Sequence, residues 1–274
     1  MPALRTALSS SILAGLTFLS AGGYGIHLTR RLSFDPWTPL EETIFASAAG
    51  YGILSLVMMA AGVVWGWTPI GAWIILGGGL TLSFPFIKTL ALLKPQKEFE
   101  NQITVLLMAL CTLWAFLLAL APVTYYDSLV YHFVIPAAYA EAHHWLSLKE
   151  LIYPAFPQNL EMLWTLGLLL GGDAVANLIS FTLTILTIAA TGAFALRWLT
   201  QRESRLSMFF LAVMPAMLLL STGGYVDVGL TLYVFLSFYA LCLWWETGRT
   251  SMLVLAGLFG GEAMGVKYTG GITK

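Results

Sequence analysis

The sequence YYDSLVYHFVIPAAYAEAHHWLSLKELIYPAFPQNLE, residues 125–161, differs from the rest of the chain because ionisable, proline and aromatic residues are mixed within it. The chain on either side is mostly apolar. Long apolar runs are typical of membrane helices, whereas a mixed stretch between them is typical of a large loop. We therefore predict that the other segments are helices that hold this loop at a bilayer surface.

Composition supports this interpretation. Of the 274 residues, 58% are hydrophobic and only 10% are charged, and the mean hydropathy is +0.81. These values exclude an ordinary soluble domain and predict an all-α, polytopic transmembrane helical bundle. The net charge of −1 and the scattered Lys and Arg residues argue against a nucleic-acid partner, because phosphate-backbone binding needs a concentrated basic face. Cys111 and Cys242 lie in apolar runs and predict neither a disulfide nor a metal site.

A helix that crosses about 30 Å of hydrocarbon needs about 20 residues. Apolar runs near this length predict about eight spans, at residues 8–27, 43–65, 69–87, 102–122, 174–196, 206–220, 226–245 and 251–266. Residues 160–170 are also apolar but too few for an upright crossing, so we expect a helix lying at the membrane interface. The chain then divides into N-terminal spans (1–122), an outer loop with interfacial helices (123–173) and further spans (174–274).

The distribution of basic residues predicts which side the loop faces. Eight spans place nine basic residues on one side of the membrane, namely Arg30, Arg31, Lys88, Lys94, Lys97, Arg197, Arg202, Arg205 and Arg249. The side of the loop receives Arg5, Lys149, Lys267 and Lys274. Since Lys and Arg are more frequent in cytoplasmic loops, the loop is expected on the non-cytoplasmic side. The first run resembles a signal peptide, but the arginine pair directly after it favours a retained span.

Three charged residues fall at span ends or loops on the side of the large loop. Asp127 is either a loop acid in an aromatic belt or a general base whose carboxylate is partly buried beside lipid. Asp227 begins a span and suits either a helix N-cap or a functional site. Lys267 either extends to the interface or contacts a phosphate. Glu161, on the proposed interfacial helix, is expected to point to water.

The histidines of the loop were considered as metal ligands. Asp127, His132, His143 and His144 match no zinc-ligand spacing, and the His143-His144 pair before Trp145 is typical of an interfacial pair. We predict no metal site from these histidines. Tyr126 and His132, which flank Asp127, are expected to contact a substrate.

Five motifs together resemble the polytopic glycosyltransferases of the GT-C superfold that use polyprenyl-phosphate sugar donors. They are TYYDSLVYH (124–132), YPAFPQNLEMLW (153–164), GGDAVANLIS (171–180), GGYVDVGLTLYVFLSFYAL (223–241) and GLFGGEAMGVKYTGG (257–271). The resemblance implies that Asp127 is the catalytic acid of the first outer loop and that Asp227 and Lys267 line the site. Many relatives carry Asp-Glu where this chain has Asp127-Ser128. The chain ends directly after the last motif, which predicts an N-terminal fragment.

The resemblance implies an integral membrane enzyme that moves a sugar from a polyprenyl-phosphate donor to a glycan, lipid or protein acceptor. Asp127 would act as general base, and Lys267 or a bound divalent metal would stabilise the departing phosphate. Direct displacement would invert the anomeric configuration. One alternative is a transporter or flippase-like protein, for which Glu262 is the clearest acid inside a span. A second alternative is a non-catalytic membrane scaffold.

Overall fold

The computed structural model describes residues 2–32, 38–94, 102–147 and 152–272. These residues fold into helices joined by turns, without a β-strand among them, which confirms the all-α prediction. The long helices are α1 (Pro2–Leu32), α2 (Pro39–Val64), α5 (Gln102–Ala119), α8 (Asp173–Trp198) and α11 (Asp227–Thr247). Between and after them lie α3 (Pro69–Thr81), α4 (Phe84–Ala91), α6 (Val134–Ala142), α7 (Asn159–Gly171), α9 (Gln201–Ala212), α10 (Pro215–Thr222) and α12 (Thr250–Val266). Short helical turns are η1 (Ser128–His132), η2 (Tyr153–Ala155) and η3 (Tyr268–Ile272).

Five of the described helices are long and apolar enough to cross a membrane, and up to seven crossings result if each of two bent helix pairs is one span. The pairs are α3 with α4, bent by 57°, and α9 with α10, bent by 60°. The predicted spans at 69–87 and 206–220 are therefore broken helices. Pro85 and Pro215 lie at the breaks, where a missing N–H and a ring clash interrupt helical hydrogen bonding. The eighth predicted span is α12, which has only 17 residues.

Two helices begin with a capping box. The Thr38 side chain accepts from the Glu41 backbone N–H, and the Glu41 carboxylate accepts from the Thr38 backbone N–H. Thr200 and Glu203 repeat this arrangement at the start of α9. The span predicted to begin at residue 206 therefore begins five residues earlier, at Gln201. The Thr-x-x-Glu pattern in the sequence marks this helix start.

In the N-terminal half of the bundle, helices α1 and α2 lie very close to each other. A Cβ atom on Gly25 would collide with the Ala46 carbonyl, and one on Gly50 would collide with the Ala21 carbonyl. Glycine therefore allows α1 and α2 to pack backbone against backbone, as small residues commonly do between membrane helices.

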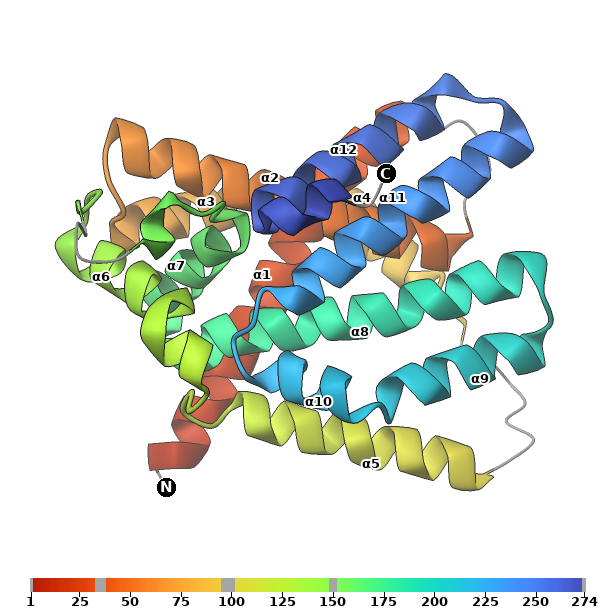
Figure 1. The fold of residues 1–274 in the computed structure, drawn as a ribbon, viewed down its shortest axis with the longest axis horizontal. Helices are drawn as coiled ribbons and strands as arrows, with labels where there is room; N and C mark the ends of the chain where they lie inside the picture. The colour runs from red at the N-terminus through yellow and green to blue at the C-terminus, as the bar shows by residue number, and fades with distance from the viewer. Residues whose placement is uncertain (1, 33–37, 95–101, 148–151, 273–274) are drawn as a thin grey trace.

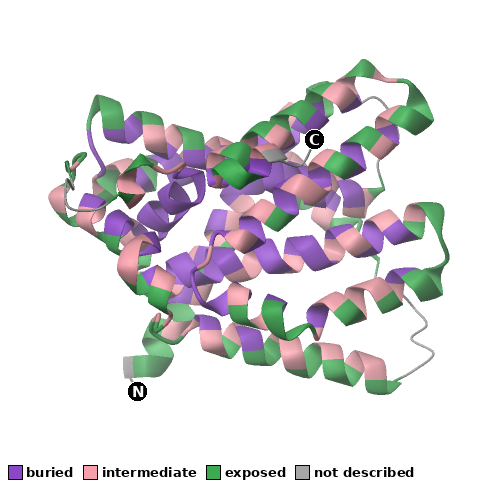
Figure 2. Cartoon of the chain, in the orientation of Figure 1, coloured by how far each residue is buried: buried purple, intermediate pink, exposed green. Residues whose placement is uncertain are grey.

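Helix α7 lies inside the bundle rather than on its surface. Its residues are buried except Leu168, Leu169 and Gly171, and it packs against α2, α6 and α8. Figure 2 shows this burial, and shows α5 as largely exposed or intermediate. Within the most apolar 18-residue stretch of α5 only 11% of the residues are buried, whereas 72% are buried in the corresponding stretch of α2. The interfacial helix expected at residues 160–170 is thus a core element, because its apolar residues surround its whole circumference instead of one face.

Ion pairs join the helix ends at one end of the bundle, which we call the basic end. Arg30 Nε lies 2.6 Å from Glu42 Oε1. Arg197 lies 3.1 Å from the buried Glu41 and 3.0 Å from Glu246. These contacts bring together the ends of α1, α8 and α11 and the start of α2, which are the ends that the sequence placed on the more basic side of the membrane.

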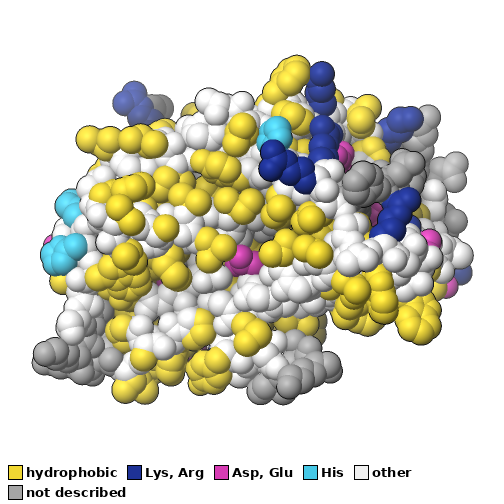
Figure 3. Space-filling view, turned by 90° about the horizontal axis from the view of Figure 1, so that it is seen from above, with side chains coloured by type: hydrophobic (Ala, Val, Ile, Leu, Met, Phe, Trp, Pro, Cys, Tyr) yellow, Lys and Arg dark blue, Asp and Glu magenta, His cyan; other side chains and the backbone are white. Residues whose placement is uncertain are grey.

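The opposite end carries Asp127, Asp227 and Lys267, and we call it the loop end. In Figure 1, α6 and α7 lie at the left and the turns between α8 and α9 and between α11 and α12 lie at the right. Figure 3 shows a face covered largely by hydrophobic side chains, with most of the visible Lys and Arg side chains in its right half. Lys97, Lys149 and Lys274 lie outside the described residues. The surface therefore has the apolar cover and the uneven basic charge expected of a multi-pass membrane protein.

Candidate active site

Asp127 lies directly before η1, a single π-helical turn. Its side chain is half-buried, does not cap the turn, and makes no hydrogen bond or ion pair with the described part of the chain. The next residue, Ser128, is buried and its hydroxyl donates to the Gly223 carbonyl. This bond joins η1 to the turn that leads into α11, so Asp127 is held near the start of that helix. π-Helical turns of this kind are frequent at functional sites.

Asp227 and Lys267 form an ion pair. Lys267 Nζ lies 3.1 Å from Asp227 Oδ1, at the start of α11 and the end of α12. The N-cap of α11 is Val226, without a side-chain cap bond, so the interpretation of Asp227 as a capping residue was wrong. The Asp227 carboxylate instead fixes a cation at the loop end.

The charges of Asp127 and Asp227 act on the same two tyrosines, Tyr131 and Tyr225. Burial raises the pKa of Tyr131 to about 12, and the negative charges of Asp127, Glu161 and Asp227 add to the effect. Burial also raises the pKa of Tyr225, again with Asp127 and Asp227 contributing. Both carboxylates are thus close enough to act on both phenols. Asp127, Asp227 and Lys267, which come from distant segments of the sequence, thus lie at the same end of the bundle. The Tyr131 hydroxyl stays protonated there at neutral pH.

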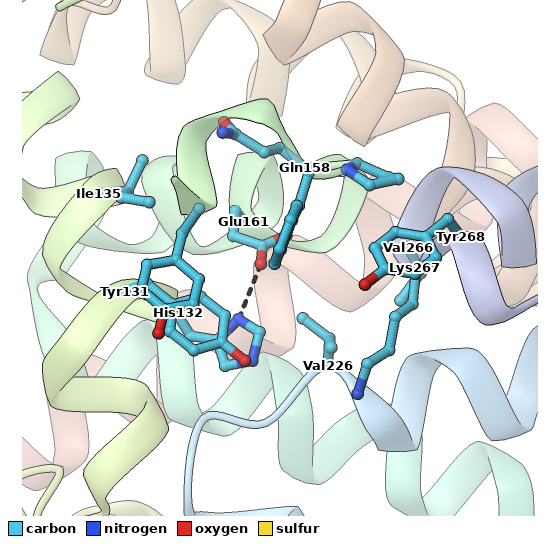
Figure 4. Close-up of a pocket in the computed structure, with 12 residues that line it drawn as sticks. Tyr131, His132, Ile135, Gln158, Glu161, Val226, Val266, Lys267 and Tyr268 are labelled. Carbon is cyan, nitrogen blue, oxygen red and sulfur yellow. Dashed lines mark hydrogen bonds and ion pairs between the residues drawn. The ribbon is translucent and has the colours of Figure 1, made fainter. Parts of the chain in front are cut away.

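A small cavity of about 50 Å³ lies beside Lys267. One wall consists of aromatic side chains, with the rings of Tyr131 and Tyr153 stacked at 4.2 Å and 5°. Phe156 touches both Tyr153 and Tyr268 edge-on, at 5.7 Å and 5.5 Å between ring centroids. Figure 4 shows Lys267 on the side of the cavity opposite Tyr131. An aromatic wall facing a cation can hold an apolar or sugar face next to an anionic group.

His132 and Glu161 form a buried pair in the same cavity (Figure 4). His132 Nδ1 donates to Glu161 Oε1 over 2.8 Å. Burial raises the pKa of Glu161, and the bond with His132 and the charge of Lys267 offset only part of this effect. The expectation that Glu161 points to water was wrong. The available signal was an acid on an otherwise apolar helix, which needs a polar partner when it is buried.

Two of the expected substrate contacts differ in position. His132 lines the cavity, although its Nδ1 is already bonded to Glu161. Tyr126 is 77% exposed and is not among the residues that line the cavity. Its position before η1 turns it outward, whereas Tyr131, one turn later, takes the inward place. Sequence reasoning also gave no role to Tyr153, Phe156 or Tyr268.

Acids, histidines and cysteines are the side chains that commonly bind a metal ion. Residues 2–32, 38–94, 102–147 and 152–272 hold no group of three or more of these residues that could bind an ion. The His143 ring is hydrogen-bonded to the Trp67 carbonyl at 2.7 Å, at the contact between α6 and the turn before α3.

Part of the chain matches a known protein family. Residues 161–273 match the family model of the dolichyl-phosphate-mannose-protein mannosyltransferases. The match covers less than half of the chain; it includes Glu161, Asp227 and Lys267 and leaves out Asp127 and His132. No curated protein and no solved structure matches the chain. The matched family confirms the resemblance that the motifs indicated: over residues 161–273 this membrane protein is similar to glycosyltransferases of the GT-C type.

Proposed function

We propose that the protein transfers a sugar from a polyprenyl-phosphate donor to an acceptor hydroxyl at the loop end of the bundle. The transferred group is a hexosyl or pentosyl unit, and the acceptor is a glycan, a lipid or a protein. The family name of the matching region supports a polyprenyl-phosphate-linked sugar as the donor. The uneven basic charge of the bundle supports a site on the non-cytoplasmic side.

The convergence of Asp127, Asp227 and Lys267 supports this proposal more than any other observation. Asp127, whose carboxylate makes no hydrogen bond or ion pair within the described residues, lies near an ion pair, and Lys267 of that pair lines a cavity with an aromatic wall. Structural acids are normally bonded to a partner, as Glu41 and Glu262 are in this protein. An unpartnered, half-buried carboxylate has the free lone pairs that a general base needs.

In the proposed reaction Asp127 removes the proton from the acceptor hydroxyl. The acceptor oxygen then forms a bond to the anomeric carbon, while the bond from that carbon to the phosphate oxygen breaks and its electron pair leaves with the polyprenyl phosphate. Attack opposite the leaving group inverts the anomeric configuration. The leaving phosphate needs no general acid, because its oxygens already carry charge, so a single carboxylate base suffices.

Lys267 is assigned to the phosphate. Negative charge grows on the bridging oxygen as the glycosidic bond breaks, and a cation fixed in advance stabilises it without reorganisation. The ion pair with Asp227 limits where the ammonium group lies before the donor binds. Tyr131, with its pKa raised to about 12, serves as a hydrogen-bond donor rather than as a base.

The transporter alternative depends on Glu262, an acid inside α12. Its carboxylate accepts a hydrogen bond from Asn159 at 3.0 Å, and Gly52 of α2 packs against its side chain. It is not among the residues that line the described cavities. Transport sites hold their acids in a water-filled path between helices. The packing of Glu262 supports a structural role, so we do not favour transport.

The test is an Asp127→Asn variant with Asp173→Asn as its control. Both changes remove one acid, but Asp173 is exposed at the start of α8 and does not contribute to the raised pKa of Tyr131 and Tyr225, as Asp127 does. In lipid nanodiscs supplied with polyprenyl-phosphate mannose and a membrane-extract acceptor, Asp127→Asn should lower transfer by about 10²- to 10⁴-fold. Asp173→Asn should transfer at the wild-type rate. Full activity of Asp127→Asn would remove its assignment as base, and a wild-type protein that neither binds nor transfers the sugar would refute the function.

A further inference from the structure

The second carboxylate oxygen of Glu161 is buried and finds no partner among the described residues. Oε1 bonds His132, whereas Oε2 has no hydrogen-bond partner in the part of the chain that the structure describes. The whole residue is 5% exposed, and it lines the cavity at the loop end. Figure 4 shows its carboxyl group between the aromatic wall and Lys267. Since a buried acceptor without a donor costs free energy, this oxygen requires a donor that enters the cavity.

The dimensions and lining of the cavity restrict that donor. The cavity, of about 50 Å³, has room for a hydroxyl or hydroxymethyl group of a bound sugar. The aromatic wall of Tyr131, Tyr153 and Phe156 presents flat apolar faces, which suit the C–H face of a sugar. Lys267 on the other wall repels an ammonium group and attracts a phosphate. A neutral hydroxyl of a sugar whose phosphate lies near Lys267 satisfies all three features.

We propose that Glu161 Oε2 accepts a hydrogen bond from one hydroxyl of the transferred sugar, so that this cavity selects the donor by that hydroxyl. The inference rests on the proposed function and adds a specificity-determining residue to it. A hydroxyl that fills the cavity gives the buried oxygen its missing donor. A sugar without that hydroxyl leaves the oxygen unpaired, and a site built around a hydrogen bond discriminates strongly against such an analogue.

His132 acts as a positioning residue in this arrangement. Its bond to Oε1 fixes the rotation of the Glu161 carboxyl group and leaves Oε2 toward the cavity. The His132 ring is itself held edge-on against Trp164 of α7, at 5.7 Å between ring centroids. The orientation of the acceptor oxygen thus depends on η1 and α7 together, and η1 is also the turn that follows Asp127.

The experiment measures binding of five donors to the full chain in nanodiscs: a polyprenyl-phosphate mannose and its 2-, 3-, 4- and 6-deoxy analogues, with bare polyprenyl phosphate as reference. In the wild type, one analogue should bind about 10- to 100-fold more weakly than the mannose donor, because it leaves a charged acceptor unpaired. In Glu161→Leu the mannose donor should fall to the level of that analogue, and the two should bind equally. Thr165→Val, on the same helix, is the fold control because its hydroxyl bonds only the Glu161 backbone carbonyl.

His132→Asn should reduce the discrimination between the mannose donor and that analogue, while the affinity for bare polyprenyl phosphate stays the same. A loss of affinity for all ligands would instead make His132 purely structural and contradict its positioning role. If Glu161→Leu does not fold, Glu161→Gln and the wild-type analogue series still give the comparison.

Equal binding of all five donors by the wild type would overturn the inference and leave the proposed function standing, since water would then satisfy Oε2. Binding of bare polyprenyl phosphate as tightly as the mannose donor would also overturn it, because the cavity would then contribute nothing to sugar binding. Failure of the wild type to bind both the mannose donor and bare polyprenyl phosphate would refute the proposed function itself.

Discussion

Lys267 Nζ lies 3.1 Å from Asp227 Oδ1 and joins the end of α12 to the start of α11. The two side chains are 37% and 35% exposed. An ion pair with this exposure contributes at most about 1 kcal/mol to stability, because water screens it and both side chains lose rotamer freedom. The ion pair is therefore more important for its position beside the aromatic-walled cavity than for its contribution to stability.

The Lys267→Met variant should separate these two contributions. Transfer should fall by about 10²- to 10³-fold, since a preorganised cation at the leaving group is lost, while the free energy of unfolding should change by less than about 1 kcal/mol. Rates in nanodiscs and thermal unfolding in detergent give the two numbers. Lys88→Met is the control, because Lys88 lies over the Phe84 ring and far from the cavity. A variant that loses stability in proportion to its activity would argue that the pair is structural.

Glu161 should give the protein a measurable pH dependence of stability. Its pKa in the folded state is raised above 4.5 by burial, against the opposing effects of His132 and Lys267. The folded state therefore binds this proton more tightly than the unfolded chain. The resulting stabilisation is fully present below about pH 4.5 and is lost as the pH rises through the folded pKa.

A comparison with Glu161→Gln checks this sign. The amide does not titrate in this range, so its stability relative to wild type should increase from pH 4 to pH 8. Unfolding temperatures of both proteins across this range provide the measurement. A stability difference that stays constant with pH would show that Glu161 has the same pKa in the folded and unfolded states.

The basic end offers a separate stability test at Glu41. This side chain is 1% exposed and accepts from Tyr239 at 2.6 Å and from Arg197 at 3.1 Å. Glu41→Ala leaves the buried Tyr239 hydroxyl without its acceptor and leaves Arg197 with Glu246, and should cost about 1–3 kcal/mol. Glu246→Ala removes the other, 45% exposed partner of Arg197 and should cost less than about 1 kcal/mol. Denaturant titration in detergent compares the two, and equal losses would contradict the assigned difference in burial.

The side of the membrane can be tested with single cysteines. Cys111 and Cys242 are free and are first replaced by Ala. A cysteine at Arg202, at the basic end, should react with a membrane-impermeant maleimide only after the membrane is opened. A cysteine at Ser147, in the large loop, should react in intact cells. The reverse pattern would refute the predicted orientation.

The sequence was sufficient to predict the helical class, and the positions of α2, α5, α8, α11 and α12 to within a few residues, because long apolar runs report membrane helices directly. It also selected Asp127, Asp227 and Lys267 as residues at one end of the bundle. That selection worked because alternating spans place every second connection on the same side. The domain boundaries and the role of Asp127 as base stay predictions.

Burial inside the bundle could not be predicted in the same way. Glu161 was predicted to be a surface acid because it lies on a short apolar helix, and such a helix resembles an interfacial helix in sequence. Hydropathy does not distinguish a lipid environment from packed protein. His132 and Glu161 are 29 residues apart, and only the fold of η1 against α7 brings them together. Pro85 and Pro215 indicate in the sequence where the two helices break, but the angles of the bends depend on neighbouring helices.

The bond between His132 and Glu161 also determines where this chain can be divided. The region that matches the mannosyltransferase family begins at Glu161, so a truncated protein made to that boundary would lack His132 and Asn159. Glu161 and Glu262 would each lose the side chain that donates to them. A boundary drawn from sequence similarity would thus produce a piece in which the buried Glu161 and the half-buried Glu262 have lost these donors. Any truncation meant to fold has to keep η1 together with α7.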